Sequence, residues 1–483
     1  MSELSIKTSK GVFWNFIEFS GQQIITLVVS IILARILMPE QFGLIGLLAI
    51  FIAIAQSIMD SGFGSALIQK KDVTQIDENS IFFFNIVTGI VLVIILVFIA
   101  PLIATYFDEP LLLPLTRVLS FSVLINSFSQ VQAIKLNKTL DFKSLMKVTL
   151  ISSFISGTIS IILALYGFGV WALAFQTIVA SLVRAISLWL ISKWRPAWTF
   201  SFDSLKSMFS FGSRIFLSGI LDSIFFNIYQ PLIGKLFSIQ DVGYFDRARN
   251  LERISIQPAG LILGRVMFPA LSTIQDEKTR MSSAVREILI STVFFHFPMM
   301  FGLICLAEPI ILILLTDKWA SSIPYFQILC LVGIIHPFQI INLNILRATG
   351  KSKLFLNLEV FNKITIILVI FITYRFGIKA LLLGQLLSSS VNYFAGRYFI
   401  SREINYPIFK QLADIAPYAI MSLVMAAVIY FVGSAIDSLW SKLILQVLVG
   451  LVVYFFLNFV FNQERLKNIW NILLHMISTQ STD

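Results

Sequence analysis

Arginines stand out among the residues that could do chemistry, because several lie inside long apolar stretches. A guanidinium is always charged and offers paired donors that fit phosphate oxygens. A cavity lined by these residues would be cationic, because few acidic residues lie near them. We therefore expect a binding site for a phosphate or diphosphate group. The candidate residues are Arg247, Arg249, Arg253, Arg265, Arg214, Arg184 and Arg35.

Two polar stripes follow a helical spacing of three or four residues, and they lie about 200 residues apart. The first stripe is Asn15, Glu18 and Gln22, and the second is Arg214, Ser218 and Asp222. An ionisable side chain at mid-bilayer costs about 2.5–3.5 kcal/mol, so such residues usually face a cavity or one another. We expect the stripes to line a cavity, with Glu18, Asp60 and Asp222 as candidate carriers of a coupling ion. Hydrogen bonding between helices of one lobe is the alternative.

Membrane helices must position these residues, because apolar blocks of about 20 residues recur along the chain. The 483 residues are 57% hydrophobic and 13% charged, whereas a soluble domain is roughly 25% charged. This composition disfavours a soluble enzyme, and the blocks lack the alternation of a membrane β-barrel. We predict an all-α polytopic protein with fourteen spans. They lie at about 11–34, 41–60, 80–105, 112–134, 148–166, 169–192, 207–234, 244–272, 286–306, 322–346, 355–374, 378–400, 413–433 and 442–461.

The positions of lysine and arginine predict that both termini are cytoplasmic. In that orientation 22 of the 36 basic residues lie in cytoplasmic segments or their flanks, and six lie outside. Membrane orientation therefore accounts for most of the +10 net charge, and no nucleic-acid partner is expected. Cys305 and Cys330 fall in or beside apolar blocks, so neither a disulfide framework nor a metal cluster is expected.

The chain also shows a weak internal repeat. Residues 40–43 resemble 240–243 at an offset of 200, and residues 168–173 resemble 376–381 at an offset of 208. Repeats of six helices share one orientation, so two lobes around a central cavity are expected. The predicted parts are an N-terminal six-helix lobe, a C-terminal six-helix lobe, a terminal helix pair and a cytoplasmic tail. They cover residues 1–196, 204–402, 411–462 and 463–483.

Four stretches resemble the polysaccharide transporter (Wzx-type) branch of the multidrug/oligosaccharidyl-lipid/polysaccharide (MOP) flippase superfamily, in particular its lipopolysaccharide, colanic-acid and teichuronic-acid exporters. These are Ile-Leu-Ala-Arg-Ile-Leu-Met-Pro-Glu-Gln-Phe-Gly-Leu at 32–44, Asp-Ser-Gly-Phe-Gly-Ser-Ala-Leu-Ile-Gln at 60–69, Val-Gly-Tyr-Phe-Asp-Arg-Ala at 242–248 and Gly-Arg-Val-Met-Phe-Pro-Ala-Leu-Ser at 264–272. The family motif covers Arg35, Gly43, Asp60, Gly243, Arg247 and Arg265. Glu18 and Arg249 lie outside the pattern, so their roles depend on spacing and charge alone.

The resemblance implies a non-enzymatic flippase in the bacterial cytoplasmic membrane. It would move undecaprenyl-diphosphate-linked oligosaccharide by alternating access, contacting membrane lipid and working beside polysaccharide polymerase or export proteins. No nucleotide-binding loop or other cofactor motif occurs in the sequence, so no cofactor is expected, and a proton or sodium gradient is the expected energy source. The alternatives are a lipid II flippase, a cation-coupled multidrug exporter of the same superfamily, a membrane glycan polymerase or ligase, and a membrane scaffold.

Overall fold

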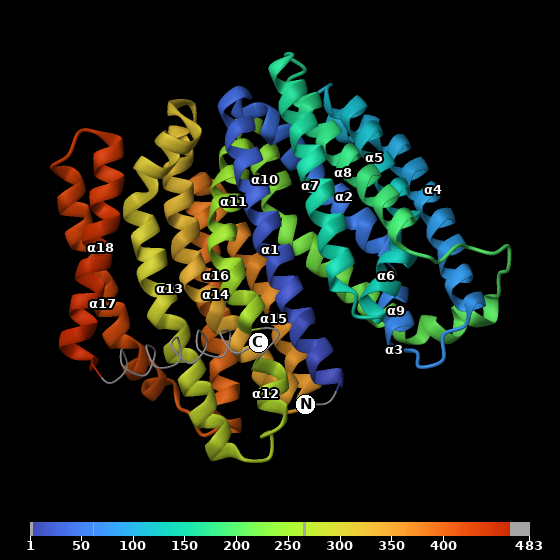
Figure 1. Cartoon of the computed structure of the whole chain (residues 1–483). Coiled ribbons are helices and arrows are strands. Elements are labelled where there is room, and N and C mark those ends of the chain that lie inside the picture. The colour runs from blue at the N-terminus through green and yellow to red at the C-terminus, as the bar shows by residue number, and fades with distance from the viewer. Residues whose placement is uncertain (1–2, 61, 264–266, 464–483) are drawn as a thin grey trace. The chain divides into compact units, whose positions relative to one another are not determined.

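A computed structural model describes residues 3–60, 62–263 and 267–463 (Figure 1). Within these ranges the regular structure consists of helices, and no β-strand occurs. The all-α class expected from the composition is therefore confirmed. The helices divide between two compact units, Met1–Asp246 and Arg247–Asp483.

The first unit begins with a long helix and ends in the first turns of α11. Its helices are α1 (Glu3–Ile36), α2 (Pro39–Asp60), α3 (Phe63–Gln69), α4 (Gln75–Tyr106), α5 (Leu112–Ser127), α6 (Gln130–Lys138), α7 (Phe142–Leu165), α8 (Val170–Ile191), α9 (Phe202–Asn227), α10 (Tyr229–Leu236) and α11 (Ile239–Ile262). Helix α7 packs on α1 and α8, and α4 packs on α5. At the end of the unit where α1 begins, Phe63, Ile81, Val131 and Trp194 form a buried apolar cluster.

The second unit continues α11 and adds the remaining helices. These are α12 (Phe268–Ser272), α13 (Lys278–Leu315), η2 (Asp317–Ser322), α14 (Ile323–Ala348), α15 (Ser352–Thr373), η3 (Tyr374–Phe376), α16 (Ile378–Glu403), α17 (Ile408–Ser434) and α18 (Leu439–Phe461). The core of this unit lies around α13, which packs against α14, α17 and α18. The two C-terminal helices are thus part of the second unit's core.

Prolines inside α13 and α14 create polar contacts between helices of the second unit. A proline lacks the N–H that would bond to the carbonyl four residues earlier, so that oxygen needs another donor. Pro298 frees the carbonyl of Phe294, which accepts a 2.7 Å hydrogen bond from the Tyr454 hydroxyl of α18. Pro337 frees the carbonyl of Gly333, which accepts a 2.9 Å bond from His296 Nε2 of α13. At Pro298 and Pro337 the freed carbonyl is therefore satisfied by a neighbouring helix.

Eleven described helices, or helices with their short extensions, are long and apolar enough to cross a membrane. The bent pair α5 and α6, which meet at 44°, makes twelve if it counts as one span. The two expected spans that are missing from this set are α11 and α16. Both are helical, over 24 and 26 residues, but their charged and amide side chains make them too polar to qualify by composition. The multi-pass membrane class is confirmed, whereas the count of fourteen stays a prediction.

Helix ends recur at the offsets seen in the sequence. Helices α1 and α10 end at Ile36 and Leu236, and α2 and α11 begin at Pro39 and Ile239. Gly169 and Gly377 both have positive φ, 57° and 91°, and each directly precedes a helix. Positive φ favours glycine, because it has no Cβ to clash with the backbone. The repeat thus places a glycine of positive φ directly before a helix at both positions, although a 3-10 helix, η3, directly precedes only Gly377.

Candidate functional site

The repeated turns pack against one another within the first unit. A Cβ placed on Gly43 would lie 2.0 Å from the carbonyl oxygen of Ile239, and one on Gly243 would lie 1.9 Å from that of Pro39. Each glycine thus lies on the first residue of the other helix, in the reciprocal manner of a two-fold contact. Helices α2 and α11 approach this closely only because both positions lack side chains.

The α1 stripe has mixed surroundings. Glu18 is half-buried and its carboxylate accepts a 2.7 Å hydrogen bond from Thr149 of α7. Asn15 is also half-buried, whereas Gln22 is exposed. Glu18 therefore makes the hydrogen bond between helices that the alternative interpretation expected. A role in lining a cavity stays a prediction for all three residues.

Asp60 lies where several helices of the first unit converge. Its exposed carboxylate at the end of α2 accepts a hydrogen bond from the Gln130 amide of α6. Gln130 in turn accepts a 2.9 Å bond from Asn85 Nδ2 of α4. Arg184 of α8 is exposed and close enough for its charge to act on Asp60. The structure thus brings two of the predicted residues, Asp60 and Arg184, into one polar group.

On α9 the stripe residues Ser218 and Asp222 lie on a different face from the residues that pack against α2. The Ser57 hydroxyl of α2 is 2.5 Å from the Ser223 hydroxyl, so Ser223 lies on the packed side of α9. Ser218 and Asp222 lie one helical turn apart on an exposed face. The side chain of Arg214 lies outside the described part of the structure. The shared face of Ser218 and Asp222 agrees with the spacing argument.

Three of the candidate arginines follow one another along α11. Arg247 and Arg249 are half-buried, and Arg253 is exposed. The charges of Arg249 and Arg253 act on Glu252, and Glu252 lies against α14, with Oε1 3.2 Å from where Gly333 would carry a Cβ. Arg35 is exposed in the last turn of α1, and Arg265 lies outside the described residues. Glu252 therefore places an acidic group within this charged segment, although the sequence argument counted few acidic residues near the arginines.

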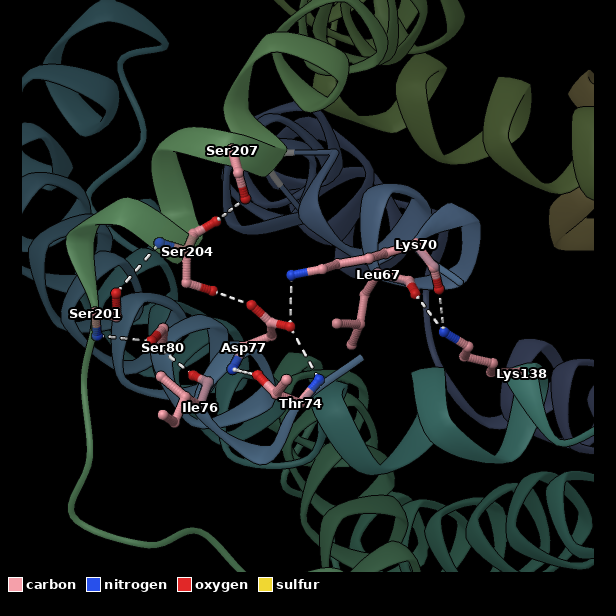
Figure 2. Close-up of polar contacts among 10 residues, drawn as sticks. All are labelled: Leu67, Lys70, Thr74, Ile76, Asp77, Ser80, Lys138, Ser201, Ser204 and Ser207. Atoms are coloured by element: carbon pink, nitrogen blue, oxygen red, sulfur yellow. Dashed lines mark hydrogen bonds and ion pairs between the residues drawn. The ribbon is translucent and has the colours of Figure 1, made fainter. Parts of the chain in front are cut away.

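A polar network that the sequence argument missed fixes the start of α4 (Figure 2). Asp77 is 3% exposed, pairs with Lys70 Nζ at 2.7 Å and caps its own helix through the Thr74 N–H at 2.9 Å. It also accepts a hydrogen bond from the Ser204 hydroxyl of α9. The Ser80 hydroxyl accepts a 2.9 Å bond from the Ser201 N–H, at the N-cap of α9. The network ties α3, α4 and α9 together.

The capping box could have been found in the sequence, because Thr74 and Asp77 have the Thr-x-x-acid spacing that begins a helix. The partners on α9 could not, since they lie more than 120 residues away.

A second polar network lies in the second unit, where α16 gives way to α17. Arg286 of α13 makes paired bonds of 2.8 and 2.6 Å to Asp414, which also accepts a 2.8 Å bond from the Tyr406 hydroxyl. Burial and the neighbouring Asp414 raise the pKa of Tyr406, so its hydroxyl remains a donor at neutral pH. Arg397 is fully buried and donates to the Tyr406 carbonyl. This network fixes the connection between α16 and α17.

The described residues include no group of three or more His, Cys, Asp or Glu side chains that could hold a metal ion. The polar features are instead helix-borne charges and amides within apolar helices. Such an arrangement on long apolar helices is that of a polytopic membrane protein. Its fold resembles that of lipid II flippase MurJ in an inward closed conformation, with a TM-score of 0.78 and 18% identity over 94% of this chain and 100% of that one. A MATE multidrug transporter of the MOP superfamily also shares the fold, with a TM-score of 0.61, 16% identity and coverage of 80% and 98%.

The family model described as "Polysaccharide biosynthesis protein" matches residues 32–324, and the chain belongs to this family. Teichuronic acid biosynthesis protein TuaB of Bacillus subtilis is 27% identical over 302 residues, which cover 62% of each chain. Succinoglycan biosynthesis transport protein ExoT of Rhizobium meliloti is 28% identical over 68% of this chain and 67% of its own length. Lipopolysaccharide biosynthesis protein WzxC of Escherichia coli is 25% identical with the same coverage. The match to TuaB spans less than two thirds of that protein's length. The resemblance seen in the sequence is confirmed at the level of the family.

Proposed function

We propose that this protein is a flippase that moves undecaprenyl-diphosphate-linked oligosaccharide across the bacterial cytoplasmic membrane for surface polysaccharide synthesis. The observation that carries the proposal is the combination of a polysaccharide biosynthesis sequence with the fold of a lipid II flippase over 94% of the chain. A diphosphate with several sugars cannot cross about 30 Å of hydrocarbon at a useful rate unless protein shields it. The role is transport, in which no covalent bond of the substrate is made or broken.

The proposed architecture has fourteen spans in two six-helix lobes, 1–196 and 204–402, followed by the helix pair 411–462 and a cytoplasmic tail, 463–483. The recurrence of helix ends at an offset of 200 supports the repeat. Helices α11 and α16, at 24 and 26 residues, are about 36 and 39 Å long at 1.5 Å per residue, which is enough to cross the bilayer. Both termini would be cytoplasmic, and alternating access would follow from rocking of the two lobes.

The diphosphate would bind arginines of α11, chiefly Arg249 and Arg253, while the polyprenyl tail stays in lipid. The exposure of Arg253 supports this role, because a guanidinium open to solvent can exchange its contacts for phosphate oxygens. Arg247, Arg265, Arg214, Arg184 and Arg35 remain further candidates. Polysaccharide polymerase or export proteins are the proposed partners.

The energy source would be a proton or sodium gradient, since one charge moved across 100 mV supplies about 2.3 kcal/mol. Asp60 is the best supported of the three carboxylate candidates. Its Gln130 and Asn85 neighbours provide amide groups around the carboxylate, and Arg184 provides a nearby charge. Glu18 is already hydrogen-bonded to Thr149, which favours a structural contribution.

The test is the pool of lipid-linked glycan in a deletion strain, sized by mass spectrometry together with surface polysaccharide. We expect undecaprenyl-diphosphate oligosaccharide to accumulate while surface glycan disappears, and unchanged pools would reject the proposal. In complemented strains, Arg247→Ala, Arg249→Ala and Arg253→Ala should each lower surface glycan at normal membrane levels of protein. Arg280→Ala is the matched control, because Arg280 is exposed and, among the residues that the structure describes, its one ion pair is with its helix neighbour Glu277. Wild-type glycan in all three variants would reject a diphosphate-binding role for the arginines.

A lipid II flippase is the second candidate, and the TM-score of 0.78 with MurJ favours it. Accumulation of lipid II with loss of viability on depletion would select that role. A multidrug exporter shares the fold at a TM-score of 0.61, but a cavity rich in arginine counts against cationic drugs.

A further inference from the structure

The first unit contains an apolar cavity of about 740 Å³ that the proposed transport does not use. It lies where α4, the start of α9 and the segment before α9 meet, and we name it the aromatic pocket. Its lining includes Phe63, Phe84, Phe83, Trp198, Phe209 and Lys206. Cavities of about 300–1,000 Å³ are typical of sites that bind small molecules. Nine of its ten lining residues are apolar, and Lys206 is the one charge.

The aromatic rings form a wall that is already assembled. Phe63 meets Phe84 edge to face at 5.0 Å, and Phe63 lies 6.4 Å from Phe209. Trp198 stacks on Phe83 with ring centroids 5.5 Å apart and an interplanar angle of 27°. Trp198 is nevertheless 95% exposed, so one face of its ring is available to a ligand.

Buried polar groups hold the segment that carries Trp198 on both sides of that residue. The Asn79 side chain, which is fully buried, accepts a 3.1 Å bond from the Ala197 N–H and donates a 2.6 Å bond to Thr199. Two residues further on, the Ser201 N–H donates to Ser80, which is also fully buried (Figure 2). The pocket is therefore preorganised rather than formed by a loose loop.

The charge at the pocket is free to act on a ligand. Lys70 pairs with Asp77 at 2.7 Å, Lys135 pairs with Glu78 at 2.8 Å, and Lys138 donates to main-chain carbonyls. Within the described part of the chain, Lys206 has no such partner. It is exposed at the edge of the apolar lining.

From these observations we infer that the aromatic pocket binds an anionic glycerophospholipid. An acyl chain fills the apolar cavity beside Trp198 and Phe209, and the phosphate pairs with Lys206. The occupant is a lipid because the pocket lies in a membrane-spanning unit, at helix ends where lysines and aromatic rings gather as they do at a bilayer interface. It is a phospholipid because this is the abundant bilayer component that combines a hydrocarbon chain with an anionic group. The bound lipid would brace the segment between α8 and α9.

The test uses the full-length protein in nanodiscs and quenching of tryptophan fluorescence by lipids brominated on the acyl chain. The chain has eight tryptophans, so the difference between wild type and Trp198→Phe isolates the signal from the pocket. We expect brominated phosphatidylglycerol to quench this signal at about one fifth of the mole fraction that brominated phosphatidylcholine needs, since one lysine near the surface contributes about 1 kcal/mol toward an anionic lipid.

Two variants separate the charge of the pocket from general surface charge. Lys206→Gln should abolish the fivefold preference, whereas Lys193→Gln should retain it, because Lys193 lies in the segment between α8 and α9 that carries Trp198, is exposed and does not line the pocket. The inference is wrong if Trp198 is not quenched by either lipid, or if Lys206→Gln keeps the preference. It is also wrong if unbrominated undecaprenyl phosphate relieves quenching more strongly than unbrominated phosphatidylglycerol, because the pocket would then belong to the transported lipid.

Discussion

Replacing Gly43 by alanine tests the reciprocal contact between α2 and α11. The new Cβ would lie 2.0 Å from the carbonyl oxygen of Ile239. Because close carbon–oxygen contacts are about 3.3–3.6 Å, the two helix ends must separate by about 1.3 Å to accommodate the methyl group. The atom that it meets is main chain, so rotation of a side chain cannot relieve the clash.

We expect a loss of stability of about 1–3 kcal/mol, the range for overpacking at a tight contact. Gly243→Ala should cost a similar amount, because its Cβ would lie 1.9 Å from the Pro39 carbonyl. The double variant should cost less than the two single costs added together. Once the first methyl group has separated the helix ends, the second meets a contact that is already relaxed.

The assay is thermal unfolding of the purified protein together with surface glycan in complemented cells. Gly219→Ala is the matched control, since a Cβ on that glycine of α9 would meet nothing within 4 Å. It should be neutral or slightly stabilising, because alanine favours helix over glycine by about 1 kcal/mol. Wild-type behaviour of Gly43→Ala, or full additivity in the double variant, would refute the reciprocal contact.

Three further predictions concern single polar groups. Asp77→Asn removes the negative charge that pairs with Lys70, so it should lower the unfolding free energy by about 2 kcal/mol and speed proteolysis of the segment between α8 and α9. Asp72→Asn, which changes an exposed carboxylate, should have neither effect. Tyr454→Phe leaves a buried carbonyl of α13 without its donor and should lower the unfolding free energy by about 1–3 kcal/mol, while the exposed Tyr430→Phe should not change it measurably. Asp60→Asn should abolish the sensitivity of glycan export to uncouplers, and an unchanged response would remove Asp60 as the ion carrier.

Much of the fold could be predicted from the sequence, because apolar length and repeat spacing are local properties. The turns at Pro39 and Ile239 fall where the offset of 200 placed them. The bend between α5 and α6, at 44°, was not predicted, because no proline or glycine marks the junction between the two helices. Spacing also failed to divide the predicted span 207–234 into α9 and α10.

The candidate site was less accessible to sequence reasoning. Helical spacing places Ser218 and Asp222 on one face, since that depends only on residues four apart, and both side chains are exposed, but their role in lining a cavity stays a prediction. It did not reveal that Glu18 would be bonded to Thr149, because a stripe defines a face but not the helix that packs on it. The aromatic pocket required contacts between Phe83 and Trp198, more than 100 residues apart.

Pro298 within α13 has a consequence for how the chain is made. The Phe294 carbonyl that it frees is satisfied by Tyr454, 160 residues further along the chain. At a synthesis rate of about 5–20 residues per second, that donor emerges from the ribosome about 8–32 s after the acceptor. During this interval the Phe294 carbonyl of α13 lacks its Tyr454 donor, and water or the insertion machinery must supply a hydrogen bond in its place. The last helix therefore completes an early one, and biogenesis of the second unit ends only when α18 arrives.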